Sequence, residues 1–151
     1  MTGPRDNHAI GEPDGAEEIG GLLLATYLWI GLGSALGGMG RYWCTEAMTR
    51  AYGTSFPWGT IFVNVSGSLV IGILATVFEP EGRLFSSPNA RVFLMIGICG
   101  GYTTFSSFSL ETMNLLRDGH WLWAGANVAG SVLLCVTAVW IGHLGAAVLT
   151  R

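Results

Sequence analysis

Four long segments without Asp, Glu, Lys or Arg dominate the pattern of hydrophobic and polar positions. They cover residues 19–40, 51–78, 92–110 and 119–150. Each reaches the roughly 18 mainly apolar residues that a helix needs to cross a bilayer. The pattern therefore predicts an all-α membrane protein with four transmembrane helices. We expect these helices at about residues 21–48, 57–78, 90–116 and 121–149.

Composition separates a short polar start from this apolar remainder. Only 11% of the 151 residues are charged, whereas a soluble domain usually carries about 25%. Residues 1–20 nevertheless hold five acidic residues against one arginine, together with two prolines. We therefore expect a disordered acidic N-terminal tail at 1–20 and a four-helix transmembrane domain at 21–151.

The third apolar segment contains a polar, glycine-rich stretch at residues 100–109, Gly-Gly-Tyr-Thr-Thr-Phe-Ser-Ser-Phe-Ser. Such backbone is tolerated at membrane depth only where protein buries it or where it lines a wet path. We expect the third helix to be broken near its middle, within residues 97–104. Carbonyl oxygens released there suit a bare cation such as Na⁺, and a plain kink against a neighbouring helix is the alternative.

The arginines give almost no bias for orientation in the membrane, and the chain has no lysine. Because lysine and arginine bias sets orientation, the chain is predicted to insert both ways and to form an antiparallel homodimer. If Arg41 is buried and so does not contribute to the charge bias, the remaining arginines instead fix one orientation weakly. The side with both termini carries Arg5, Arg83, Arg91 and Arg151, and the other side carries Arg41, Arg50 and Arg117.

Polar and aromatic side chains within the apolar segments are the candidates for chemistry. Asn64, near the middle of the second segment, either joins helices or offers its amide N–H groups to a permeating anion. Phe105 and Phe108 are three residues apart and share a helix face, so they either pack or turn their electropositive ring edges to an anion. Thr104 and Ser107 add hydroxyl donors beside them.

Other polar residues narrow the class of function. Arg41 follows a glycine-rich run, where it either raises the local concentration of anions or extends its charge to the lipid headgroups. The three cysteines and three histidines show no metal-ligand spacing. No pairing of a nucleophile with a base is visible, so we do not expect an enzyme.

These residues fall in motifs that resemble the Fluc/CrcB family of fluoride channels. The resemblance covers about residues 28–149 and excludes the acidic tail. The motifs that carry it are Gly-Gly-Met-Gly-Arg-Tyr at 37–42, Pro-Trp-Gly-Thr-Ile-Phe-Val-Asn-Val-Ser-Gly at 57–67, and Gly-Ile-Cys-Gly-Gly-Tyr-Thr-Thr-Phe-Ser-Ser-Phe at 97–108, followed by Ser109 to Glu111.

The resemblance implies a dual-topology homodimer with two separate fluoride pores along the subunit interface. It places Arg41 near the pore entrance. Asn64 is similar to the pore asparagine of helix 2, with Thr60 at a polar position one turn earlier. Phe105 and Phe108 resemble the two phenylalanines whose edges face fluoride.

The resemblance also implies a structural Na⁺ and further polar positions. Gly100 and Thr103 match the residues whose carbonyls hold a Na⁺ shared by both subunits. Ser131 matches a polar serine of helix 4, and Asn127 stands one turn earlier, where many members carry Tyr. Both are expected to belong to the fluoride pore, and Asn127 keeps a hydrogen-bond donor there. The implied activity is passive export of cytoplasmic fluoride through the plasma membrane, which is the inner membrane of a bacterium.

A small proton-coupled multidrug exporter is the alternative function, because such exporters also have four spans. That chemistry needs a carboxylate inside the membrane, and residues 19–40 contain none. A non-transporting assembly subunit would account for the small-residue helix faces. It would leave the hydroxyls beside two phenylalanines without a role.

Overall fold

The computed structural model describes residues 14–79 and 87–149, and every regular element within these ranges is a helix. The predicted all-α class is therefore confirmed. The elements are α1 (Asp14–Tyr52), α2 (Trp58–Val77), α3 (Pro88–Arg91), the π-helix η1 (Val92–Cys99), α4 (Gly100–Tyr102), α5 (Phe105–Arg117) and α6 (Trp121–Leu149).

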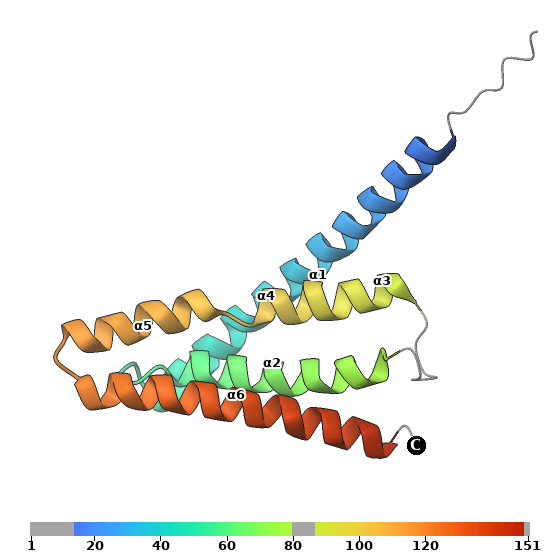
Figure 1. Ribbon diagram of the computed structural model, residues 1–151. Coiled ribbons are helices and arrows are strands. Elements are labelled where there is room, and N and C mark those ends of the chain that lie inside the picture. The colour runs from blue at the N-terminus through green and yellow to red at the C-terminus, as the bar shows by residue number, and fades with distance from the viewer. Residues whose placement is uncertain (1–13, 80–86, 150–151) are drawn as a thin grey trace, which may run out of the picture.

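Four helical stretches are long and apolar enough to span a membrane, as predicted. They are Glu17–Tyr52, Trp58–Val77, Pro88–Arg117 and Trp121–Leu149. The second, third and fourth run side by side, while α1 crosses them obliquely (Figure 1). A helix of 39 residues is about 58 Å long, nearly twice the roughly 30 Å of a hydrocarbon core. The oblique course of α1 suits this length.

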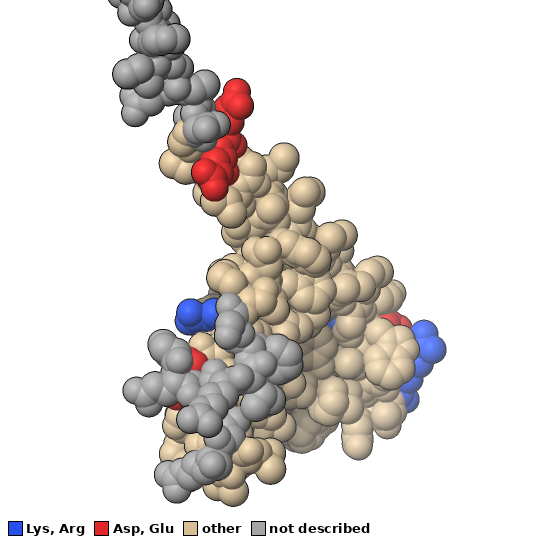
Figure 2. Space-filling model, turned by 90° about the vertical axis from the view of Figure 1, so that its right-hand side faces the viewer, with Lys and Arg blue, Asp and Glu red and all other residues tan. Residues whose placement is uncertain are grey.

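Helix α1 begins inside the segment predicted as a disordered tail. Residues 1–13 lie outside the described residues, but residues 14–20 form the first turns of α1. Glu17 and Glu18 lie in these turns, where negative side chains interact favourably with the positive end of the helix dipole. Figure 2 shows this acidic patch on the projecting part of α1, above a largely uncharged face. Helix α1 therefore begins seven residues before the end of the segment expected as a tail.

Glycines allow α1 to lie directly against the backbone of η1 and α4. A Cβ on Gly33 would come within 2.8 Å of the Gly97 Cα, and one on Gly37 would meet the Ile98 carbonyl oxygen. Gly101 faces α1 in the same way, because its Cβ would lie 2.6 Å from the Ser34 carbonyl oxygen. Both partners thus carry glycines four residues apart, a spacing that lets helix backbones approach closely in lipid.

A second glycine contact joins α2 to α6. A Cβ on Gly72 would meet the Val139 carbonyl oxygen, and one on Gly142 would meet the Leu69 carbonyl oxygen. These crossings pack α2 closely against α6, and α2 also contacts α1 and η1.

The third span is not continuously α-helical. Thr103 (φ −76°, ψ 158°) and Thr104 (φ −152°, ψ 117°) have extended backbone between α4 and α5. Gly97, Gly100 and Gly101 are helical. The glycines at 97 and 101 serve close packing against α1, and the extended residues are the two threonines that follow.

The glycine contact predicts a sharp difference between two neighbouring substitutions. Gly37→Ala places a methyl group against the Ile98 carbonyl, and we expect a loss of about 1–3 kcal/mol of stability from overpacking. Gly38→Ala is the matched control, because nothing lies within 4 Å of its Cβ position. The unfolding temperature in detergent, followed by size-exclusion chromatography, measures both. Equal effects of the two substitutions would contradict the close contact.

Candidate functional site

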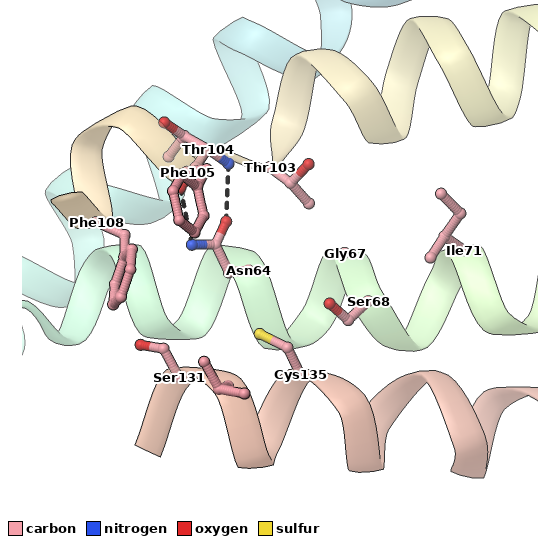
Figure 3. A pocket seen from close by; sticks show the side chains of 11 residues that line it. Asn64, Gly67, Ser68, Ile71, Thr103, Thr104, Phe105, Phe108, Ser131 and Cys135 are labelled. Atoms are coloured by element: carbon pink, nitrogen blue, oxygen red, sulfur yellow. Dashed lines mark hydrogen bonds between the residues drawn. The ribbon is translucent and has the colours of Figure 1, made fainter. Parts of the chain in front are cut away.

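The side chain of Asn64 pairs with the backbone of Thr104. Asn64 Nδ2 donates to the Thr104 carbonyl oxygen at 2.9 Å, and the Thr104 N–H donates to Asn64 Oδ1 at 2.8 Å (Figure 3). The amide therefore replaces the helical partners that the extended backbone has lost. Buried backbone groups left without partners are costly, so this pair stabilises the extended segment.

The extended backbone also leaves two carbonyl groups of the third span without the N–H partners of a continuous helix. In a continuous helix the Thr104 N–H would donate to the Gly100 carbonyl, but here it donates to Asn64. The Ser107 N–H would likewise donate to the Thr103 carbonyl, but it donates to the Thr104 hydroxyl at 3.2 Å. Thr104 thus caps α5. The carbonyls of Gly100 and Thr103 are not used by these N–H groups.

A cavity of about 290 Å³ lies against this pair, between α2, the extended segment and α6. The rings of Phe105 and Phe108 stand at its side with centroids 5.2 Å apart and planes inclined by 49° (Figure 3). Phe108 is only 8% exposed, whereas Phe105 is 77% exposed. The cavity therefore has one ring fixed within the chain and one ring facing outward.

Three polar side chains, two of them buried, connect the two sides of the cavity. Ser131 Oγ donates to Asn127 Oδ1 at 3.4 Å, and Asn127 Nδ2 donates to Thr112 Oγ1 at 2.8 Å. Thr112 Oγ1 donates to the Phe108 carbonyl oxygen at 2.7 Å. Asn127 has no exposed surface. This chain of hydrogen bonds links α6 to the first turn of α5.

A second, more polar cavity of about 390 Å³ lies near the turn between α1 and α2. Thr60 and Glu111 both line it, and Thr60 Oγ1 donates to Glu111 Oε1 at 2.7 Å. The other carboxylate oxygen, Glu111 Oε2, is buried without a hydrogen-bond partner among the described residues.

The structure gathers some of the predicted site residues and separates others. Thr60 lines the second cavity, while Ser107 and Asn127 line neither cavity. Arg41, half-buried on α1, and the exposed Gly100 lie outside both linings. The predicted residues that line the first cavity together are Asn64, Thr103, Thr104, Phe105, Phe108 and Ser131.

Sequence reasoning missed several lining residues that helical spacing would have found. Gly67, Ser68 and Ile71 follow Asn64 by three, four and seven positions, and all line the same cavity. Cys135 follows Ser131 by four positions and faces the cavity as well (Figure 3). Residues three and four apart share one helix face. One lining residue therefore predicts which other residues of its helix also line the cavity.

Comparison with known proteins assigns the chain to a family. The family described as CrcB-like protein, Camphor Resistance (CrcB), matches residues 28–143, which include every residue of the first cavity. The chain belongs to the CrcB-like protein family. This match covers most of α1 and all of the following helices as far as His143 of α6.

Individual CrcB-like relatives are similar over nearly their whole length. The fluoride-specific ion channel FluC of Rhodospirillum rubrum is 52% identical over 126 residues, which are 83% of this chain and 98% of the relative. The protein of the same name from Opitutus terrae is 54% identical over 123 residues, 82% of this chain and 93% of the relative. The protein of the same name from Paramagnetospirillum magneticum is 51% identical over 128 residues, which are 85% of this chain and 100% of the relative.

The Asn64 pairing predicts that this side chain is needed for stability. Asn64→Leu leaves the N–H and the carbonyl of buried Thr104 without these partners, and we expect a loss of about 1–3 kcal/mol. Ser68→Ala is the matched control, one turn further along α2 and on the same cavity, with an expected change within about 0.5 kcal/mol. Unfolding temperatures in detergent compare the two. An Asn64→Leu protein as stable as the Ser68→Ala protein would show that the pair contributes nothing.

Proposed function

We propose that this chain is a fluoride-specific ion channel that lets cytoplasmic fluoride leave the cell passively and so lowers its toxicity. The observation that carries the proposal is the cavity in which Asn64, Phe105, Phe108 and Ser131 meet, in a chain about half identical to proteins named as fluoride-specific channels. The protein is a multi-pass membrane protein and not an enzyme. A bacterial inner membrane is its proposed location.

The chemistry of the cavity suits a small anion that has shed water. An asparagine amide has two N–H donors, and Asn64 uses one of them on the Thr104 carbonyl, which leaves the second for an ion. The edges of phenyl rings are electropositive, and Phe105 and Phe108 both border the same space. An inside-negative potential then drives fluoride outward, with about 2.3 kcal/mol per charge for each 100 mV.

We propose that the pore is completed by a second copy in an antiparallel, dual-topology homodimer with two pores. Phe105 supports this proposal, because a large apolar ring beside the cavity is left 77% exposed by its own chain. The nearly balanced arginines on the two sides support insertion in both orientations. In this arrangement the partner covers the open side of the cavity, and Arg41 attracts anions near the entrance.

A structural Na⁺ at the dimer interface fits the released carbonyls. Na⁺ prefers oxygen ligands, and the carbonyl oxygens of Gly100 and Thr103 are not used by the N–H groups that a continuous helix would supply. Gly100 is also exposed, with only the Met95 carbonyl oxygen within 4 Å of its Cβ position. We propose that these carbonyls hold a Na⁺ shared by both subunits, which would tie the two extended segments together.

The comparisons do not support the alternative of a proton-coupled drug exporter, since the relatives carry the name of a fluoride-specific channel. The first span also has no carboxylate between residues 19 and 40.

Purified protein in liposomes loaded with fluoride tests the proposed activity. We expect fluoride efflux, recorded with a fluoride electrode, and chloride efflux no faster than from protein-free liposomes. Phe105→Ile replaces the ring by an apolar side chain without an electropositive edge and should slow the efflux. Equal fluoride and chloride efflux, or no efflux from well-reconstituted protein, would refute the channel function.

The orientation of the chain in cells tests dual topology separately from fluoride conduction. With an epitope at the C-terminus, comparable fractions of the protein should be accessible to protease from each side of the inner membrane, because the arginine bias is small. An epitope exposed on one side only would contradict the antiparallel dimer. It would leave the fluoride efflux assay unaffected.

A further inference from the structure

Asn127 is the most deeply buried polar side chain near the cavity, although it does not line it. Val63 and Asn127 are the largest side chains among the described residues with essentially no exposed surface. A buried amide needs hydrogen-bond partners, and those of Asn127 are Thr112 on α5 and Ser131 on its own helix α6.

The hydrogen bonds around Asn127 form a chain whose two ends reach the cavity. One end is Ser131, and the other is the backbone of Phe108, to which Thr112 donates. Both Ser131 and Phe108 line the cavity. A substitution at Asn127 therefore affects the positions of both Ser131 and Phe108, although Asn127 does not contact an ion in the cavity.

The direction of these bonds fixes the orientation of the amide. A hydroxyl has a single hydrogen, and that of Thr112 lies 2.7 Å from the Phe108 carbonyl oxygen, a group that can only accept. Thr112 must then accept from Asn127, which turns Nδ2 towards Thr112 and Oδ1 towards Ser131. Asn127 thus offers Ser131 an acceptor and draws the hydrogen of this hydroxyl towards itself.

The bond from Ser131 is the weakest of the three. Its length is 3.4 Å, whereas O–H···O bonds cluster near 2.7–2.8 Å. An anion in the cavity can therefore take over the Ser131 hydrogen at little cost, while the shorter bonds through Thr112 keep Phe108 in place. This series of hydrogen bonds is therefore short and strong on the side of α5 and long and weak on the side of α6.

We propose that Asn127 is a positioning residue of the fluoride pathway and not a ligand of the ion. It holds the turn of Phe108 through Thr112 and keeps the Ser131 hydroxyl ready to rotate towards an anion. This inference rests on the proposed fluoride channel function. It differs from the implied place of Asn127 within the fluoride pore itself.

A double-mutant cycle separates positioning through Thr112 from direct contact with the ion. Asn127→Ala and Thr112→Val should each lower fluoride efflux at low fluoride by about five-fold, the equivalent of one net hydrogen bond. The half-saturating fluoride concentration should rise in both. The double variant should be no slower than Asn127→Ala alone, because both substitutions remove the same link.

Two further variants make the test independent of folding defects. Thr112→Ser keeps the hydroxyl and should retain wild-type efflux and half-saturation. Thr137→Val removes an exposed hydroxyl from the same helix as Asn127 and should change neither. If Asn127→Ala yields no folded protein, Thr112→Val compared with Thr112→Ser carries the test. All rates are taken per folded protein after size-exclusion chromatography.

Each outcome decides the proposal. Effects that multiply to about 25-fold in the double variant, the product of the two five-fold losses, would show that Asn127 acts on the ion independently of Thr112. Single variants with wild-type efflux and half-saturation would overturn the positioning role while the channel function stands. A wild-type protein that passes no fluoride would overturn the channel function and this inference with it.

Discussion

The pairing of one asparagine amide with an extended backbone is the constraint on which the site depends. At Thr104 the backbone of the third span is extended and lacks helical hydrogen bonds, inside a segment long and apolar enough to cross the membrane. Lipid offers no replacement partners, so Asn64 supplies both a donor and an acceptor from α2. The extended segment then turns Phe105 and Phe108 towards the same cavity and frees the carbonyls of Gly100 and Thr103.

Close glycine contacts make this pairing possible. Side chains larger than hydrogen at Gly33 or Gly97 would push α1 away from η1, and one at Gly67 would meet the Cγ2 atom of Thr103. The small residues bring α2 near enough for Asn64 to reach the Thr104 backbone. In lipid, where apolar burial does not drive helices together, such contacts supply much of the attraction between helices. The glycines thus allow the helices to pack closely, and the hydrogen bonds between Asn64 and Thr104 fix how α2 lies along the third span.

The amino-acid sequence predicts the four spans and much of the cavity, because both follow from properties of single helices. Charge-free length defines a span, and spacing of three or four residues places Phe105 and Phe108 on one face. Contacts between helices are a different matter. Neither the Thr104 backbone as the partner of Asn64 nor the burial of Asn127 behind the cavity follows from periodicity, since both depend on how neighbouring helices are rotated. Composition and charge put the end of the acidic tail at residue 20, whereas seven residues of that segment, 14–20, belong to α1.

Hydrogen–deuterium exchange at the backbone N–H of Thr104 tests the central pairing most directly. This N–H is free of any helical carbonyl and is protected by Asn64 Oδ1, so we expect slow exchange in the native protein. In Asn64→Leu the same N–H should exchange much faster, while N–H groups in the middle of α2 stay protected. Fast exchange at Thr104 in the native protein, or equally slow exchange in both proteins, would contradict the account.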